Sequence, residues 1–259
     1  IVTRNFNSSW MMYDHHLYPG AAWRIHMLRG LLGESDFWAG VTEYLSLYSG
    51  KVVETSDFRH VLERVSGRSL ASFFDQWLHR PGYPKLNVKT NHSKSDKELT
   101  VTIEQTQESP SDTPEEKRVG LFDIRIEIGL QSPNGDWSYH QVDMSEKRHT
   151  LVLKCDESPH QIVIDPSTKL LHELTFDPGV EMLTETLTEC PHVSGRLHAA
   201  KTLSESGKPG AVEALKRAYT TEPHWGVRTG ISRSLGQVGT SQACDALASL
   251  LDVECDARA

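Results

Sequence analysis

Apolar residues in the first third of the chain recur with the period of a helix. Between residues 18 and 32 they return every three or four positions, so they share one face of a helix. The predicted buried face consists of Ala22, Ile25, Leu28 and Leu32. Gly33 follows the last of them and is placed to end the helix.

Three more segments of this kind follow before residue 84. The second helix begins after a cap at Ser35 or Asp36, and the third begins at Thr55. The fourth spans 69–79, because Pro81 cannot continue a helix. The predicted buried side of the second helix consists of Phe37, Val41, Tyr44, Leu45 and Tyr48. These short helices predict a packed helical unit.

After Pro84 the helical period gives way to the alternation of β-strands. Short runs with alternating or β-branched residues are separated by polar turns such as SPNGD at 132–136. The runs are KLNVKT, ELTVTIEQT, LFDIRIEIGL, WSYHQVDM, HTLVLKC and HQIVIDP. Six or seven strands over this length predict a small antiparallel β-sandwich.

The last third is predicted to be helical again, and it contains an internal repeat. A shift of 32 positions superposes Arg196 on Arg228, Leu203 on Leu235, Gly207 on Gly239, Ala211 on Ala243 and Leu215 on Leu247. A helical hairpin repeated at this period, with small residues and a glycine at the turn, is typical of HEAT or armadillo α-solenoids. We expect Arg196 and Arg228 to bind the ends of neighbouring helices rather than a substrate. Either more repeats follow or these two dock on the sandwich.

Composition excludes several classes of protein. The chain has 27 Lys plus Arg against 35 Asp plus Glu, a formal net charge of −8, and no basic block, which argues against a nucleic-acid partner. No apolar run approaches the ~18 residues of a membrane-spanning helix. The 4 cysteines lie far apart without a CxxC motif, so neither a disulfide framework nor a zinc knuckle is indicated.

The chain contains no complete active-site motif. It has no HExxH, GxSxG, GxGxxG or P-loop sequence, and no two histidines three or four positions apart. His15 and His16 are adjacent, and two neighbours in an extended segment point in opposite directions, so we expect at most one to line a site. For Cys190 and His192, a buried thiol beside a turn is favoured over a pair of metal ligands.

Residues 14–88 nevertheless carry an ordered series of motifs. These are a tyrosine before a leucine-rich helix that ends in LG, a TxDF helix start, an LExxSG helix end, an FFxxW helix and a GxP turn. The series comprises Tyr18, Leu28, Gly33, Phe37, Tyr44, Leu45, Thr55, Asp57, Phe58, Leu62, Glu63, Ser66, Gly67, Phe73, Phe74, Trp77, Gly82 and Pro84. It resembles the stretch downstream of the zinc site in the aminopeptidase N family of gluzincin metallopeptidases, in which the tyrosine opens a YxKGA motif.

This resemblance implies an α+β multidomain architecture. Residues 1–84 would be the helical C-terminal part of a thermolysin-like metallopeptidase catalytic domain, 85–178 a β-sandwich, and 179–259 the start of a HEAT-like α-solenoid. The implied activity is zinc-dependent hydrolysis of N-terminal peptide bonds, with a peptide as substrate. Protein contacts through the HEAT-like repeats are a further expectation.

The resemblance carries over one functional residue to this chain. The family binds zinc with the histidines of HExxH and a later glutamate, and these are expected upstream of Ile1, so no metal ligand is assigned here. The tyrosine of YxKGA, here Tyr18, donates a hydrogen bond to the oxyanion of the tetrahedral intermediate. A phenol has a pKa near 10 and is protonated at neutral pH. A structural tyrosine at a helix start is the alternative.

One departure from the motif weakens the catalytic interpretation. Gly20 and Ala21 stand where the family has lysine and glycine, so the lysine is lost. Tyr13 is expected to be a packing aromatic, and Arg24 and His26 to be structural or rim residues.

Two rival interpretations stay open. The first is a non-catalytic aminopeptidase-like scaffold for protein interaction, and the second is a HEAT-repeat adaptor. The chain opens without methionine, which suggests a fragment. Because the HExxH motif and the zinc-binding glutamate are missing, we expect the chain to be inactive alone. Its compartment stays open, with the cytoplasm favoured.

Overall fold

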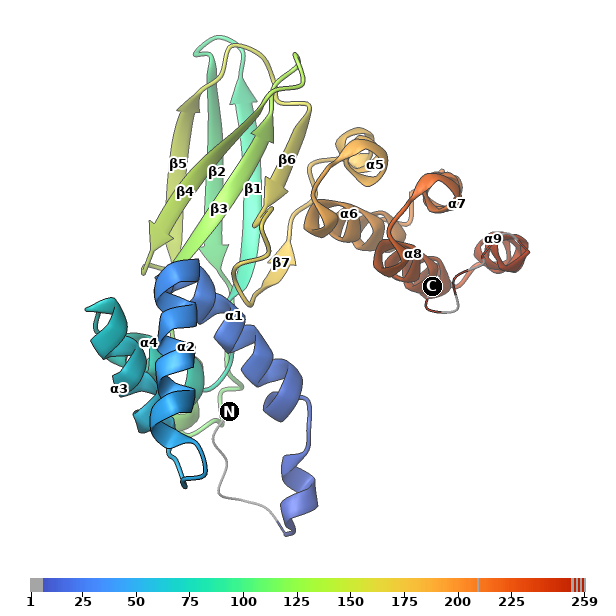
Figure 1. Cartoon of the computed structure of the whole chain (residues 1–259). Coiled ribbons are helices and arrows are strands. Elements are labelled where there is room, and N and C mark those ends of the chain that lie inside the picture. Colours follow the sequence, from blue (N-terminus) through green and yellow to red (C-terminus); the bar gives the residue numbers. More distant parts are fainter. Residues whose placement is uncertain (1–6, 209, 253, 255, 257, 259) are drawn as a thin grey trace. The chain divides into compact units, whose positions relative to one another are not determined.

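The computed structural model describes residues 7–208, 210–252, 254, 256 and 258 (Figure 1). The chain divides into two compact units. The first consists of the described residues of Ile1–Lys85, Thr106–Phe122 and Lys169–Glu173. The second consists of those of Leu86–Gln105, Asp123–Thr168 and Leu174–Ala259. The predicted division into three domains at residues 84 and 178 stays a prediction.

The first unit is a small helical assembly. Its elements are η1 (Ser9–Met12), η2 (His16–Gly20), α1 (Ala21–Leu32), α2 (Glu34–Tyr48), α3 (Thr55–Ser66), α4 (Ala71–Phe74), η3 (Asp75–His79) and η4 (Glu115–Lys117). Its core is a cluster of buried apolar side chains: Leu28, Leu32, Phe37, Leu62, Leu70 and Phe74. The four predicted helical segments are therefore present, and the first and the fourth each include a π-helical turn.

Helix ends follow the local sequence signals with one correction. Gly33 has φ 82° and ψ 164°, ends α1 and is also the N-cap of α2, so the predicted cap at Ser35 or Asp36 is wrong. Few residues other than glycine adopt this conformation, and it leaves no room for a separate capping residue. At α3, Glu54 and Asp57 form a capping box.

The buried face of α1 is rotated from the predicted one. Ile25 is 46% exposed, whereas Arg24, Met27 and Leu28 are buried. Arg24 lies outside the predicted apolar face, and its N–H groups find carbonyl acceptors in the interior. Leu45 of α2 was also expected to be buried and is 61% exposed.

The second unit begins with the β-sandwich. Its strands are β1 (Lys85–Ser93), β2 (Glu98–Gln105), β3 (Ile124–Gln131), β4 (Trp137–Met144), β5 (Arg148–Lys154), β6 (Gln161–Ile164) and β7 (Glu173–Thr175). They form one sheet in the order β5-β2-β1-β7 and another in the order β4-β3-β6. The β1/β2, β2/β5, β3/β4 and β3/β6 pairs are antiparallel. Every other residue of β2 is buried, as in a strand with one face on the core. The six predicted strands are confirmed.

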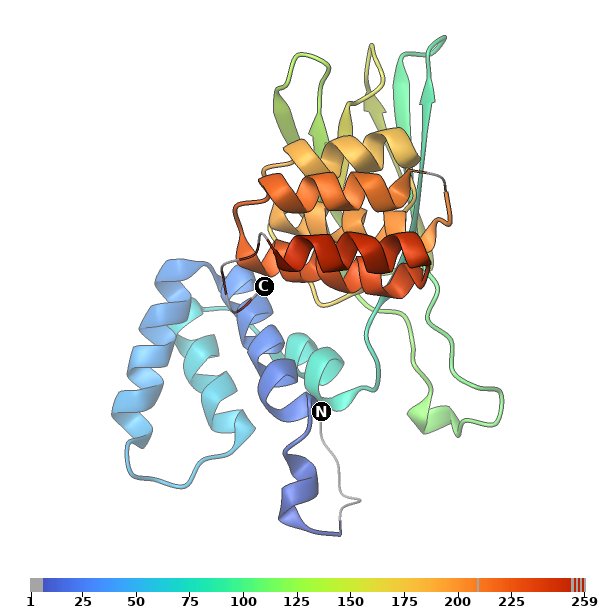
Figure 2. The same cartoon turned by 90° about the vertical axis from the view of Figure 1, so that its right-hand side faces the viewer.

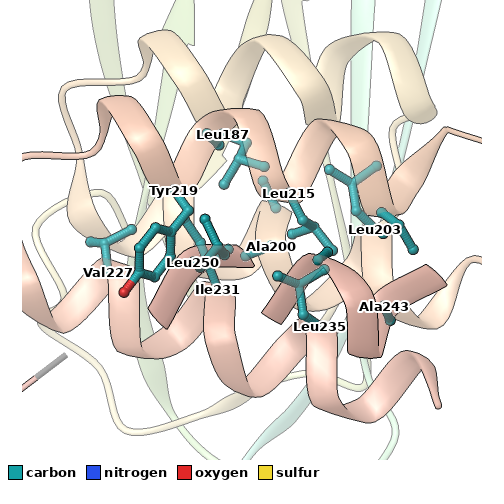
Figure 3. Packing of buried hydrophobic residues seen from close by; sticks show 14 of the residues in the cluster. Leu187, Ala200, Leu203, Leu215, Tyr219, Val227, Ile231, Leu235, Ala243 and Leu250 are labelled. Atoms are coloured by element: carbon teal, nitrogen blue, oxygen red, sulfur yellow. The ribbon is translucent and has the colours of Figure 1, made fainter. Parts of the chain in front are cut away.

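The helical repeats complete this unit, and Figure 2 shows their helices lying side by side. They are α5 (Val180–Glu189), α6 (Val193–Glu205), α7 (Ala211–Thr221), α8 (Trp225–Val238) and α9 (Ser241–Leu251). Figure 3 shows their shared core, in which Leu203 and Leu235 are both fully buried. These two leucines superpose in the 32-residue shift, so equivalent residues of the repeat occupy equivalent core positions. Within the described part of the chain, no helix has the length and apolar character needed to cross a membrane.

Candidate functional site

Tyr18 lies in the π-helical turn η2, and Asp14 fixes the start of this turn. Asp14 Oδ1 accepts hydrogen bonds from the backbone N–H groups of His16 (2.8 Å) and Leu17 (3.2 Å). The Leu17 N–H also donates to the backbone carbonyl of Asp14 at 3.2 Å, so the carboxylate and the backbone of Asp14 together hold the first residues of the turn.

Residues 19 and 20 explain why the hydrogen bond of this turn spans five residues rather than four. Pro19 has no N–H to donate. The Gly20 N–H donates to the carbonyl of His15, five residues earlier, at 2.9 Å. Single π-helical turns occur frequently at functional sites.

The side chain of Tyr18 is 68% exposed and belongs to a short series of aromatic rings. Its ring centroid lies 6.1 Å from that of Tyr13, which in turn lies 5.6 Å from that of Trp10. Tyr13 therefore packs between two rings, as predicted for a packing aromatic, although it is 58% exposed. No hydrogen bond to the Tyr18 hydroxyl occurs among the described residues, so the hydroxyl is available to an external acceptor.

The two adjacent histidines have different roles. The His15 carbonyl accepts the hydrogen bond that closes the turn, and the His16 ring Nδ1 lies 2.9 Å from Asp14 Oδ2. The hydrogen bond with the His16 side chain is the main cause that lowers the pKa of Asp14. Both histidines are exposed, and the prediction that at most one lines a site stays a prediction.

Arg24 joins the end of the Tyr18 turn to another element of the first unit. Its Nη1 donates to the Gly20 carbonyl at 2.9 Å, and its Nε donates to the Trp77 carbonyl in η3. The side chain is buried, and desolvation lowers the pKa of the guanidinium. The position of Arg24 is therefore structural rather than at a rim.

Zinc, which the family resemblance implies, does not fit the side chains that are described. No group of three or more His, Cys, Asp or Glu residues within residues 7–208, 210–252, 254, 256 and 258 could hold a metal ion. At the pair considered from sequence, Cys190 is buried and burial raises the pKa of its thiol. His192 Nε2 lies 3.0 Å from the Tyr139 hydroxyl.

The repeat arginines bind helix ends, as predicted. Arg196 Nη1 donates to the carbonyl of Cys190 at the end of α5 (2.7 Å), and Arg228 Nη1 donates to the carbonyl of Glu222 at the end of α7 (3.0 Å). Each guanidinium also makes two hydrogen bonds to a carboxylate. Arg196 pairs with Glu222 at 2.7 and 3.1 Å, and Arg228 with Glu254 at 2.7 and 3.2 Å.

Sequence reasoning missed these two glutamates. Glu222 and Glu254 are separated by the same 32 positions as the arginines, so the superposition that revealed the repeat contains them as well. They are polar residues outside the apolar pattern, and that pattern predicts only apolar core positions.

Two family descriptions match this sequence. Residues 3–77 match the Peptidase family M1 domain, and residues 180–259 match HEAT repeats. The first match includes the Tyr18 turn and Arg24, and the second includes both ion pairs between arginine and glutamate.

Curated relatives of the chain are aminopeptidases. It is 32% identical over 83 residues to probable aminopeptidase 2 of Sulfurisphaera tokodaii, which covers 32% of this chain and 11% of the relative. It is 27% identical over 146 residues to alanine/arginine aminopeptidase of Saccharomyces cerevisiae, covering 56% and 16%. It is 30% identical over 123 residues to aminopeptidase N of Escherichia coli, covering 48% and 14%. The matches thus span between 11% and 16% of these relatives' length.

A solved structure has a similar fold. The aminopeptidase A of Legionella pneumophila, determined in complex with aspartic acid, matches with a TM-score of 0.70 and 15% identity over 96% of this chain and 31% of that one. At this identity the likeness shows the fold alone. Together with the sequence matches, it identifies the chain as similar to the C-terminal portion of the aminopeptidase N family, with HEAT-like repeats in its last helical region.

Proposed function

We propose that this chain is the C-terminal part of a zinc-dependent aminopeptidase that hydrolyses N-terminal peptide bonds, with Tyr18 as the oxyanion stabiliser. The observation that carries the proposal is the exposed Tyr18, on a turn whose first residues bond to Asp14 and whose last residue bonds to Arg24, within the segment that matches the Peptidase family M1 domain.

The phenol hydroxyl of Tyr18 can stabilise the transition state by donating a hydrogen bond. When the scissile carbonyl carbon is attacked, negative charge develops on its oxygen, and a fixed hydroxyl donor stabilises that charge more than it stabilises the neutral substrate. Because the hydroxyl has no partner among the described residues, it need not break an internal hydrogen bond before it donates. The turn is fixed by backbone bonds, so little reorganisation is needed.

The experiment is Tyr18→Phe in the full-length protein that carries this chain. Loss of one oxyanion donor is expected to lower kcat by about 10²- to 10³-fold with a smaller change in KM. Tyr13→Phe is the matched control, since it removes a hydroxyl from the neighbouring ring, and its kcat should stay close to that of the wild type. An unchanged kcat in Tyr18→Phe would remove this residue from the mechanism.

The zinc ion of the proposed enzyme is held by residues outside this chain. The described side chains do not fit it, and the matches cover a small part of each relative. The 259 residues alone should therefore bind no stoichiometric zinc and release no product from aminoacyl anilides. Zinc-dependent turnover by the purified chain would contradict this assignment.

A non-catalytic scaffold is the second candidate function. It is favoured by one observation, the Gly20 that replaces the lysine of the family motif. In that case the HEAT-like repeats would bind another protein, and the full-length protein would hydrolyse no aminoacyl anilide. Turnover that depends on the Tyr18 hydroxyl would exclude it.

A further inference from the structure

Space, rather than backbone conformation, disfavours a side chain at position 20. Its φ of −67° and ψ of −42° are ordinary helical values that any residue adopts. A Cβ at this position would lie 3.2 Å from the His15 carbonyl oxygen and 3.3 Å from Arg24 Nη1, both tighter than ordinary contacts. The guanidinium of Arg24 therefore lies where a side chain at position 20 would begin.

Positions 20 and 24 are neighbours on one side of the helix. Residues four apart lie one above the other along a helical surface, so a long cationic side chain at either position can reach the same space. In this chain the cation stands at the second of these positions, Arg24.

Both acceptors of Arg24 are neutral carbonyl oxygens. They belong to Gly20, the last residue of the Tyr18 turn, and to Trp77 in η3. No carboxylate among the described residues pairs with this guanidinium, and desolvation is the cause that shifts its pKa. A buried cation without a carboxylate is costly, which indicates a role that an apolar residue could not fill.

We propose that Arg24 is a positioning residue that fixes the Tyr18 turn against η3. This inference rests on the proposed function of Tyr18. Arg24 acts through the backbone at Gly20, two residues after Tyr18, and its bond to Trp77 prevents the turn from shifting. A small displacement of a catalytic group can reduce the rate by about 10²-fold.

A double-mutant cycle in the full-length protein tests this role. Arg24→Met should lower kcat by about 10- to 100-fold with little change in KM, and Arg24→Lys should recover part of the loss. In a Tyr18→Phe background, Arg24→Met should have little further effect, because the hydroxyl that it positions is absent. If the reduction of kcat in the double variant equals the product of the two single reductions, the inference is overturned.

Substitutions at positions 20 and 24 test whether a side chain at position 20 would occupy the space of the Arg24 guanidinium. Gly20→Lys alone should lower kcat, because its Cβ meets the Arg24 guanidinium. Gly20→Lys combined with Arg24→Met removes the guanidinium that the new Cβ would meet, and it should turn over faster than the product of the two single effects predicts. A double variant as slow as that product would show that position 20 and Arg24 do not share this space. If Arg24→Met fails to fold, the double variant and Arg24→Lys carry the test, and inactivity of both in folded form counts against the role of Arg24.

The outcomes separate the two proposals. If Tyr18→Phe keeps the wild-type kcat, the proposed function itself fails. If Tyr18→Phe loses activity and Arg24→Met does not, the function stands and the role of Arg24 is overturned. Circular dichroism and thermal unfolding of each variant establish that the compared proteins are folded.

Discussion

The two units differ in what surrounds their interior arginines. In the first unit, Arg24 contacts the carbonyls of Gly20 and Trp77. In the second, Arg196 and Arg228 also contact carbonyls at helix ends, but each has a carboxylate that neutralises it. The repeats thus combine a helix-end contact with an ion pair, whereas the Tyr18 turn uses the helix-end contact alone.

The presence or absence of a carboxylate partner distinguishes an arginine that stabilises the fold from one that positions a neighbouring turn. Removal of one partner from a buried ion pair leaves an uncompensated charge, so loss of a repeat arginine is expected to destabilise the repeats. Removal of Arg24 leaves neutral carbonyls, whose loss costs less. A buried arginine whose removal is expected to cost little stability, and that contacts the turn with the exposed Tyr18, fits a role in placing that turn.

Glu222→Ala should have the largest effect on stability. The Glu222 and Arg196 side chains are 3% and 11% exposed, so the variant leaves a largely buried guanidinium without its carboxylate. We expect the repeats to lose about 3 kcal/mol, which accelerates hydrogen exchange in peptides of α6 and α8 by about two orders of magnitude. Glu222→Gln keeps the acceptor oxygen and should lose less. Unaltered exchange in Glu222→Ala would show that the pair contributes nothing.

Arg24→Met should have a smaller effect than Arg196→Met. The first leaves carbonyls that are already part of helical turns, and we expect a loss of about 1 kcal/mol in the first unit. The second leaves the Glu222 carboxylate buried and unpaired, with a loss of about 3 kcal/mol. Hydrogen exchange of α1 and of α6 measures the two losses in parallel. Equal losses would remove the distinction between the arginines.

The smallest effect is expected for Glu254→Gln, as a change in how the stability of the protein depends on pH. Hydrogen bonds from Arg228, Tyr219 and the backbone of Asp256 lower its pKa from 4.5 to about 2. A carboxyl with a lowered folded-state pKa stabilises the native state above the unfolded-state value, and this contribution is lost as the pH falls from about 4.5 to about 2. Glu254→Gln should lack this part of the acid sensitivity, which thermal unfolding between pH 5 and pH 2 measures. The same acid sensitivity in both proteins would contradict the assignment.

The sequence predicts elements that depend on local patterns. The six strands follow from alternation, and the start of α3 from Thr55 and its neighbours. The start of α2 was predicted wrongly, because the conformation of Gly33 serves two helices at once. Likewise, Ile25 was expected to be buried, because apolar periodicity cannot show that Arg24 finds two carbonyl acceptors inside.

For the candidate site, the sequence supplies Tyr18 through a family resemblance and not through its own chemistry. The bonds from the His16 and Leu17 N–H groups to the Asp14 carboxylate, and the π-helical register, depend on the local path of the backbone, which the residue pattern does not reveal. The contact between Arg24 and Gly20 likewise depends on a three-dimensional distance. The glutamates of the ion pairs were accessible from sequence, because they follow the same 32-residue shift as the arginines.

Glu222 takes part in both ion-paired contacts, because its carboxylate binds Arg196 and its carbonyl binds Arg228. The residue that follows α7 therefore supplies both the carboxylate for the arginine of its own repeat and the carbonyl for the arginine of the next repeat. Gene duplication or deletion of a whole 32-residue unit would leave every arginine with both of its partners. An insertion within a helix that shifts the arginine or the glutamate relative to the packed helices would instead separate the pair, whereas an insertion confined to a loop need not.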